Sequence, residues 1–228
     1  EKPFLAPAAR RVVSSAGRFS REVQFFQDTW ARDGSGTARN SDPVAWLRMD
    51  LILPFKVGDA IETRTYDAGY RGAWFRGKLT DMRIREDHLE CQVEYIDYPY
   101  EKRRWSRLYK VPPKCRNQKA GQNREIMLRP AFPQWCWEND ILEHWPQTDV
   151  LAVVSSPWKV GDLIDWWYND CFWTGKIIEF LGEDKVKIIC PEIPIGEGGC
   201  WAADTKDLRP ALDWSLLKGW IAPLSQDF

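Results

Sequence analysis

Alternating apolar and polar positions recur through most of the chain after residue 53. Such a two-residue period is typical of strands with one buried face. Six segments show it, in two series of three: 60–66, 74–84 and 88–98, then 163–168, 172–181 and 184–193. A hairpin turn over Gly182–Asp184 separates two strands of the second series. The pattern predicts an all-β fold of short strands.

The first 50 residues follow a different pattern. Residues 1–18 show little periodicity, and we expect them to be mobile. The next segment has apolar residues at helical spacing, namely Phe19, Val23, Phe26 and Trp30. Ser20 is a candidate N-cap for this segment. This predicts one short amphipathic helix. Residues 33–43 have the composition of a loop.

The two series of strands belong to an internal repeat. Three motifs occur twice in the same order: PFKVGDAIE (54–62) and PWKVGDLID (157–165), GAWFRGKL (72–79) and CFWTGKII (171–178), MLRPAF (127–132) and DLRPAL (207–212). The first copy is longer, mainly because of a basic insert at 100–125. Two copies predict a tandem of small domains rather than a solenoid.

We therefore divide the chain into five parts: an extension (1–50), copy one (51–133), a connector (134–156), copy two (157–216) and a tail (217–228). A domain as short as copy two buries a marginal core. Closing the sheet into a barrel and packing one copy against the other would both remedy this. The connector contains Trp135, Trp137 and Trp145, so we expect it to pack between the copies.

The order of the motifs resembles that of the plant Agenet domain, a Tudor-like member of the Royal group. The segment LRPALDW (208–214) is similar to the end of the second copy of a tandem Agenet domain. DAGYRGAWFRGKL (67–79) and VEYIDYP (93–99) resemble the first Tudor domain of tandem modules that read histones. The resemblance covers roughly residues 53–214. It implies two packed five-stranded barrels.

The resemblance also implies a binding site for methylated lysine. In the related Tudor domain three aromatic residues enclose the methylated ammonium, and they match Phe75, Tyr95 and Tyr98 here. An acidic residue upstream assists, and Asp67 is the nearest match, one position out of register. The implied ligand is a histone H3 tail, with dimethylated lysine nine as the favoured mark.

The residue types suit that ligand on physical grounds. A methylated ammonium keeps its charge but loses hydrogen-bond donors, and aromatic faces attract such a cation. Strand alternation places Phe75 on the same face as Leu79, and Tyr95 on the same face as Val93. Both aromatic residues should therefore lie at the mouth of the barrel.

Other aromatic and acidic residues have a structural interpretation beside a functional one. Paired aromatics at the start of a strand usually pack in or over a core, and we interpret Trp74 and Trp173 in this way. Copy two has Ile189, Cys190 and Pro191 where copy one has tyrosines, which predicts an incomplete cage. Further candidates for cage or peptide contacts are Trp74, Tyr66, Asp97, Trp167, Tyr168, Phe172, Asp165 and Asp170.

The charge is unevenly distributed, although the net charge is only -1. Basic residues are in excess in copy one, and acidic residues are in excess after residue 134. The acidic half favours a cationic partner such as the rest of a histone tail. Its candidate contacts are Asp162, Asp165, Asp170, Glu179, Glu183 and Asp184. Arg103, Arg104, Arg107 and Lys110 form a basic cluster that could instead contact nucleic acid.

The sequence offers little to support catalysis or a cofactor. It contains no glycine-rich phosphate loop, nucleophile elbow or HExxH motif. The six cysteines include no CxxC pair, so we expect free thiols and no metal. Apolar runs of membrane-spanning length and a signal-peptide core are both missing. We expect a nuclear, non-enzymatic reader of methylated histone H3 that does not contact membranes; the alternatives are a nucleic-acid-binding module and a scaffold for a partner protein.

Overall fold

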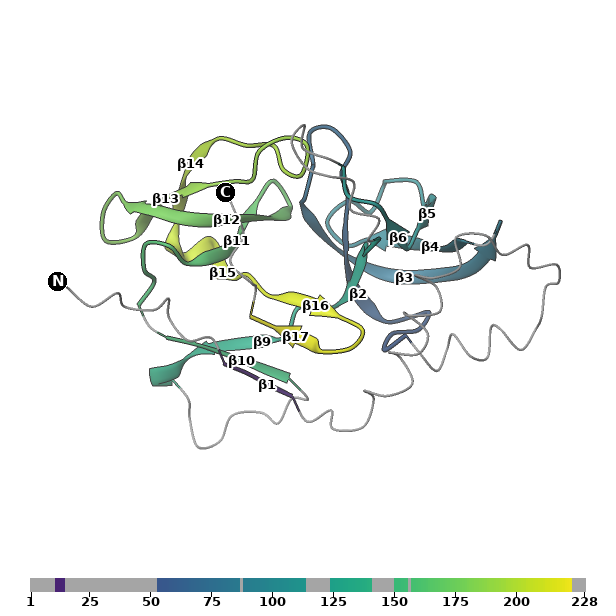
Figure 1. Cartoon of the computed structure of the whole chain (residues 1–228), viewed down its shortest axis with the longest axis horizontal. Coiled ribbons are helices and arrows are strands. Elements are labelled where there is room, and N and C mark those ends of the chain that lie inside the picture. Colours follow the sequence, from purple (N-terminus) through teal and green to yellow (C-terminus); the bar gives the residue numbers. More distant parts are fainter. Residues whose placement is uncertain are drawn as a thin grey trace.

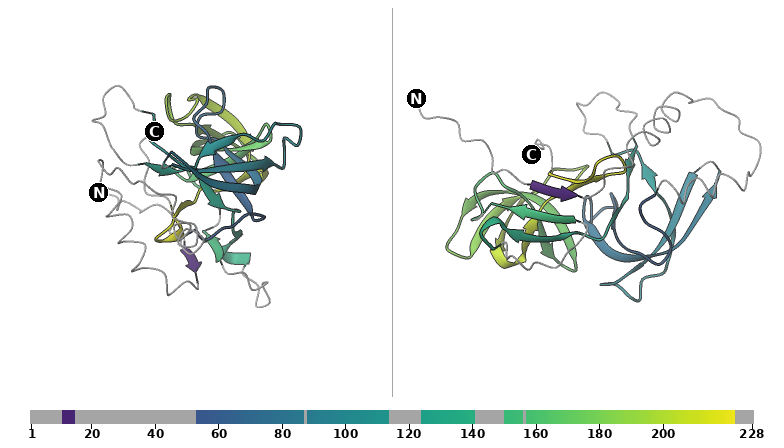
Figure 2. Two further views of the ribbon diagram at one scale, coloured as in Figure 1. Left: turned by 90° about the vertical axis from the view of Figure 1, so that its right-hand side faces the viewer. Right: turned by 90° about the horizontal axis from the view of Figure 1, so that it is seen from below.

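The computed structural model describes residues 11–14, 53–86, 88–113, 124–140, 150–155 and 157–222. Regular structure within them is almost entirely strand, with short 3₁₀ helices η1 (Glu138–Asp140) and η2 (Thr205–Asp207). Two barrels lie side by side, and a smaller sheet lies next to the second of them (Figures 1 and 2). The predicted all-β tandem is confirmed. The predicted helix near Phe19–Trp30 lies outside the described residues.

Copy one forms a five-stranded antiparallel barrel. Its strands are β2 (Ala60–Arg64), β3 (Trp74–Arg85), β4 (His88–Tyr95), β5 (Trp105–Arg107) and β8 (Leu128–Pro130), in the spatial order β8–β2–β3–β4–β5. Alternate positions face inward, so Ile61, Leu79, Val93 and Leu128 are buried together. A bulge between Leu79 and Asp81 bends the long strand β3 around this core.

Copy two repeats this arrangement strand for strand. Its strands are β11 (Leu163–Tyr168), β12 (Cys171–Phe180), β13 (Lys185–Ile189), β14 (Cys200–Asp204) and β15 (Leu208–Pro210), in the order β15–β11–β12–β13–β14. Ile164, Ile177, Ile188 and Leu208 fill the core. A bulge between Ile177 and Glu179 matches the one in β3. The sequence repeat is thus a repeat of structure.

Short strands also form outside the barrels. At the base of the basic insert β6 (Tyr109–Lys110) pairs with β7 (Glu125–Ile126). A three-stranded sheet has the order β1–β10–β9 and consists of β1 (Arg11–Ser14), β10 (Val150–Val154) and β9 (Gln134–Trp137). Residues 11–14, within the segment expected to be mobile, thus form a strand that pairs with β10.

The connector packs on the core of copy two, and Trp135 also joins a small cluster that contains Phe132 of copy one and Leu212 of copy two. Trp135 and Trp137 lie against the core of copy two, with ring centroids 6.1 and 4.8 Å from that of Trp158. Trp145 lies outside the described residues. The hairpin of β16 (Asp213–Ser215) and β17 (Gly219–Ile221) follows copy two, and the predicted boundary between 216 and 217 falls within its turn.

The two barrels join through equivalent elements. Trp74 at the start of β3 pairs with Phe172 near the start of β12, so one ten-stranded sheet runs through both copies. The two paired-aromatic motifs therefore meet at the joint. Beneath this joint lies a buried group of four charges, which we call the quartet and which consists of Glu62, Arg129, Asp165 and Arg209.

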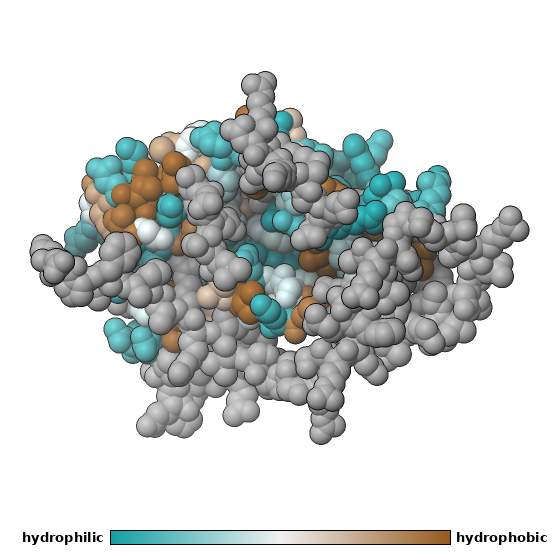
Figure 3. Space-filling view, in the orientation of Figure 1, coloured by the Kyte–Doolittle hydropathy of each residue, from teal (hydrophilic) through white to brown (hydrophobic). Residues whose placement is uncertain are grey.

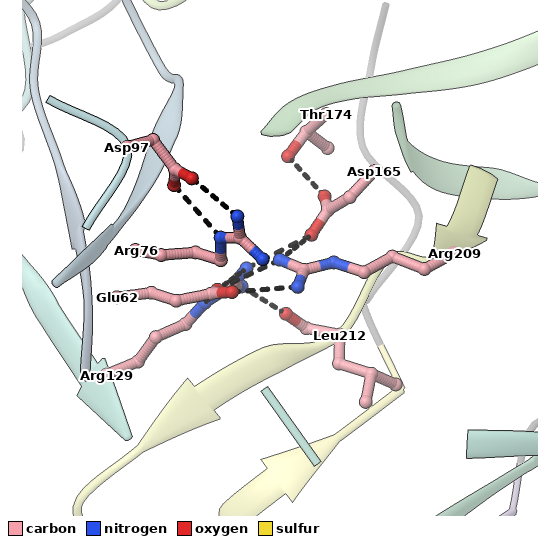
Figure 4. A network of polar contacts seen from close by, with 8 residues as sticks. All are labelled: Glu62, Arg76, Asp97, Arg129, Asp165, Thr174, Arg209 and Leu212. Carbon is pink, nitrogen blue, oxygen red and sulfur yellow. Dashed lines mark hydrogen bonds and ion pairs between the residues drawn. The ribbon is translucent and has the colours of Figure 1, made fainter. Parts of the chain in front are cut away.

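The quartet links the repeated motifs of both copies (Figure 4). Arg129 contacts Glu62 at 2.7 Å and Asp165 at 3.0 Å. Arg209 contacts the same two carboxylates, at 2.7 and 3.2 Å. Each arginine thus binds the acid of its own copy and that of the other. Aromatic faces cover both guanidinium groups: Trp74 lies 3.8 Å from that of Arg129, and Phe172 lies 3.4 Å from that of Arg209.

Candidate functional site

Phe75 stands at the centre of an aromatic cluster on copy one. Its ring centroid lies 5.5 Å from that of Tyr70, 5.8 Å from that of Tyr95 and 5.9 Å from that of Tyr98. The three contacts are steeply inclined, with interplanar angles of 63°, 74° and 60°. The structure therefore brings the three predicted cage aromatics together and adds a fourth, Tyr70.

Strand register explains how these rings meet. Phe75 alternates with Gly77 and Leu79 on the inner face of β3, and Gly77 pairs with Tyr95 at the end of β4. A side chain at Gly77 would collide with Val93, so glycine allows β3 and β4 to approach at this point. Tyr98 follows in the turn after β4, and Tyr70 comes from the loop between β2 and β3. All four rings consequently gather at one end of the barrel.

Copy two holds two of the four rings. The Tyr98 hydroxyl donates a 2.7 Å hydrogen bond to the backbone carbonyl of Asn169. Tyr70 stacks on Trp173, with centroids 6.3 Å apart and planes inclined by 19°. Next to Tyr70, Arg71 forms a 2.9 Å ion pair with Glu197. The cluster thus lies at the junction of the barrels.

Carboxylates surround the cluster and influence its tyrosines. Burial raises the pKa of Tyr95, and the nearby charges of Glu101 and Asp67 raise it further. Burial likewise raises the pKa of Tyr98 to about 12, with contributions from Asp170 and Asp97. Both phenols therefore stay neutral and protonated near pH 7. Asp67, the predicted acidic partner, is exposed and near enough to Tyr95 to act on it.

The other copy-one candidates have different partners. Trp74 is 8% exposed and lies between the guanidinium groups of Arg64 and Arg129, which agrees with its interpretation as a structural cover. The Tyr66 hydroxyl donates a 2.9 Å hydrogen bond to Glu125, and no ring contact joins it to the cluster among the described residues. Asp97 binds the Arg76 guanidinium, next to the quartet (Figure 4).

Two acidic candidates of copy two are corrected by the structure. Asp165 is 1% exposed within the quartet, where no peptide can reach it. Burial alone would raise its pKa, but Arg129 and Arg209 outweigh that effect and hold the pKa below its usual value. Asp162 is also buried, and it accepts a 3.0 Å hydrogen bond from the Lys159 backbone within the VGD turn. Its role is therefore to hold the turn.

The remaining copy-two candidates divide between the joint and the surface. Trp167 and Phe172 pack together with centroids 4.7 Å apart, and arginines cover both rings at the joint. Tyr168 is exposed and stacks on Trp166 rather than on the cluster. Asp170 is exposed and close enough to Tyr98 to raise its pKa. Of these four residues, Asp170 is the one that adjoins the cluster.

Copy two has no equivalent of the cluster at the same strand positions. Gly175 occupies the position of Gly77, so Trp173 corresponds to Phe75 and Cys190 to Tyr95. Cys190 is 5% exposed, and burial raises the pKa of its thiol to about 12. A small buried thiol offers no aromatic wall, as the sequence predicted for this copy.

The predicted basic cluster is partly neutralised within copy one. Arg103 contacts Glu94 at 2.6 Å, and Arg104 contacts Glu101 at 3.5 Å. Arg107 is exposed and Lys110 is half-buried. In the described part of the chain no group of three or more His, Cys, Asp and Glu could hold a metal ion. The same part contains no helix that is both long and apolar enough to span a membrane.

Sequence reasoning missed Tyr70. The signal for Tyr70 was the difference between the copies: Asn169 and Asp170 alone connect β11 to β12, with the positive φ angles of a tight hairpin turn. Copy one has a longer loop at the same place, residues 65–73, and that loop carries Tyr70. Trp173 packs against the core of copy two, in line with its structural interpretation, and its contact with Tyr70 depends on how the barrels dock.

The paired small barrels, with inclined aromatic rings at the mouth of one of them, define a Tudor-like tandem. Residues 58–133 match the Agenet domain family model. Copy two, which follows this matched region, repeats its strand order. Agenet domains are binding modules rather than enzymes.

The chain is similar to one curated protein and to two solved structures. The chain is 26% identical over 152 residues to Protein AGENET DOMAIN (AGD)-CONTAINING P1 of Arabidopsis thaliana, covering 66% of this chain and 25% of that protein. It thus spans about a quarter of that relative's length. The crystal structure of AGD34 of Arabidopsis AGDP1 matches with 20% identity and a TM-score of 0.47, covering 82% of this chain and 100% of that one. The tandem Agenet domain 3-4 of ADCP1 matches with 19% identity and a TM-score of 0.45, covering 80% and 97%.

Proposed function

We propose that this protein is a chromatin reader that binds the histone H3 tail at a methylated lysine, held over Phe75. The observation that carries the proposal is the arrangement of the cluster. Tyr70, Tyr95 and Tyr98 each contact Phe75 edge to face, and no ring contact joins the three tyrosines to one another among the described residues. Such inclined rings suit a rounded ammonium group approached from several sides.

The chemistry of the cluster favours a methylated ammonium. Each desolvated aromatic face contributes about 0.5–2 kcal/mol of attraction to a cation. Methyl groups match the apolar rings and reduce the cost of removing water. Asp67 and Asp170 are exposed carboxylates near the rings, and neither forms an ion pair with another described residue. A carboxylate there could accept the single N–H of dimethyllysine, which trimethyllysine lacks.

The acidic half of the protein supports a basic peptide as the ligand. Residues after 134 carry an excess of Asp and Glu, and the cluster lies where copy two meets copy one. We propose that copy two contacts the remaining basic residues of the tail, and that dimethylated lysine nine is the mark in the cluster. The protein would then act in the nucleus.

Calorimetry with H3 peptides tests the proposal. The affinity should differ between the unmodified peptide and the peptides methylated at lysine four or lysine nine. The peptide with dimethylated lysine nine should bind most tightly. Tyr95→Ala removes one wall, worth up to about 2 kcal/mol, and should weaken binding by up to about thirtyfold. Tyr100→Ala is the matched control, because Tyr100 is 98% exposed beyond the cluster and should not affect binding.

Equal affinity for methylated and unmethylated peptides would contradict the proposal. So would full binding by a folded Tyr95→Ala variant. A salt titration separates the nucleic-acid alternative, because binding to duplex DNA falls steeply with salt whereas binding to an aromatic cage falls less.

A further inference from the structure

Copy two carries a different aromatic group at the mouth of its barrel. Trp166 and Tyr168 alternate with the core residue Ile164 along β11 and so share its inward face. Trp201 on β14 pairs with the core residue Ile188 and therefore lies on the inward face too. We call Trp166, Tyr168 and Trp201 the copy-two aromatic group. None of its members occupies a strand position that corresponds to a ring of the Phe75 cluster.

The rings of this group are less steeply inclined to one another than those around Phe75. Trp166 and Tyr168 stack with centroids 4.5 Å apart and planes inclined by 14°. Trp201 lies 6.5 Å from Trp166 with an inclination of 34°. Trp166 is 7% exposed, whereas Tyr168 and Trp201 are 45% and 47% exposed. The group thus has a buried base and two rings open to solvent.

A carboxylate adjoins the group. Gly198 and Gly199 have positive φ angles, and the Trp201 indole donates a 3.2 Å hydrogen bond to the Gly198 carbonyl. A side chain at Gly198 would collide with the Glu192 carboxylate, and one at Gly199 would press on the Trp201 indole. Two successive glycines therefore make room for the acid and the ring side by side. Glu192 is exposed and forms no ion pair with another described residue.

Ring orientation distinguishes this group from the Phe75 cluster. Edge-to-face rings around Phe75 suit a rounded ammonium, whereas stacked or moderately tilted rings, as in the copy-two aromatic group, suit a flat cation. The protein shows the second kind of contact at its own joint. There the Arg209 guanidinium lies 3.4 Å from the Phe172 ring centroid and 3.7 Å from that of Phe132. Guanidinium groups stack on aromatic faces and also bind carboxylates in their own plane.

We propose that the copy-two aromatic group is a second binding site, for the guanidinium of an arginine in an extended basic peptide. The guanidinium stacks against the exposed rings of Tyr168 and Trp201, and Glu192 accepts its hydrogen bonds. This site is separate from the Phe75 cluster, and it stands or falls independently of the methyllysine proposal.

Nitrogen-15 NMR of the whole chain tests the site with N-acetyl-arginine methylamide as the probe. The indole N–H signal of Trp201 is assigned by its loss in Trp201→Phe. We expect that signal to shift and saturate with the arginine probe, and to shift less with N-acetyl-lysine methylamide. Glu192→Gln should weaken the probe's binding by about two- to fivefold, as expected for an exposed charge pair.

Two further variants complete the design. Glu183→Gln removes another exposed acid of copy two, at the β12–β13 hairpin, and should leave the arginine response unchanged. Tyr95→Ala should also leave it unchanged, because the ring contacts of Tyr95 are with the Phe75 cluster and the core of copy one. The proposal is overturned if the Trp201 signal does not move with arginine. Equal responses to lysine or trimethyllysine probes, or an unaltered response in Glu192→Gln, would overturn it as well.

Discussion

Single residues at equivalent positions of the two copies have taken different roles. Phe75 and Trp173 occupy the same place in the repeat, yet Phe75 is the centre of the cluster and Trp173 supports one of its rings from outside. Tyr98 serves both copies, because its ring contacts Phe75 while its hydroxyl binds Asn169. The ring and the hydroxyl of Tyr98 can therefore be separated by mutation.

Tyr98→Phe keeps the ring and removes the hydrogen bond to Asn169. Loss of one neutral hydrogen bond should lower the free energy of unfolding by about 0.5–1.5 kcal/mol. Methylated-peptide binding should weaken less than in Tyr98→Ala, which also removes the ring. Because the pKa of Tyr98 is raised to about 12, the phenol remains a donor and wild-type binding should be constant from about pH 7 to 9. Chemical denaturation measures the change in stability, and calorimetry across this pH range measures the change in peptide binding. Equal losses of peptide affinity in Tyr98→Phe and Tyr98→Ala would contradict the separate roles of the ring and the hydroxyl.

Elements set by local patterns could be predicted from the sequence. Strand alternation located β2, β3, β4, β11, β12 and β13, and the repeated motifs showed that one barrel follows the other. The docking of the barrels could not be predicted, because it depends on contacts between residues far apart in the chain. Tyr70 on Trp173, Asp165 in the quartet and the connector against copy two are all contacts of this kind.

The loop before β3 offers a test of the docking at the level of elements. Gly72 has a φ of 80°, and a side chain there would approach the Ile195 carbonyl of copy two to 2.8 Å. Gly69, in the same loop, has a φ of 88° and open space around it. Both substitutions by alanine incur the cost of left-handed backbone, about 1–2 kcal/mol.

Gly72→Ala should therefore lower the free energy of unfolding by more than Gly69→Ala. It should also weaken methylated-peptide binding, because the loop that carries Tyr70 must move away from copy two. Thermal or chemical unfolding and calorimetry on both variants provide the comparison. Equal stability of the two would mean that the close approach to Ile195 does not constrain the docking.

At the scale of the whole molecule, the quartet determines how the barrels meet. Its acids end the repeated segments VGDAIE and VGDLID, and its arginines belong to the repeated LRP motifs. The sequence signal for such a buried ion-pair group is a charge that recurs inside an apolar motif, since a buried charge requires a partner. The sequence could not show that each arginine binds across the joint as well as within its own copy.

Asp165→Asn tests this role. Removing one partner from a buried ion pair leaves part of the positive charge of Arg129 and Arg209 without a neighbouring negative charge. We therefore expect a loss of about 3–5 kcal/mol in the free energy of unfolding. Asp204→Asn, which removes a surface partner of Lys185 at 3.6 Å, is the matched control and should cost at most about 1 kcal/mol.

The pH dependence of that loss gives an independent check. The pKa of Asp165 is lower in the folded protein than the value of about 3.9 expected in the unfolded chain. Its stabilising contribution is therefore complete above pH 4 and disappears as the pH falls through the folded-state pKa. The difference in unfolding free energy between wild type and Asp165→Asn should be constant from about pH 5 to 8 and shrink below about pH 4. A difference that persists undiminished in acid would show that the carboxylate charge is not what holds the barrels together.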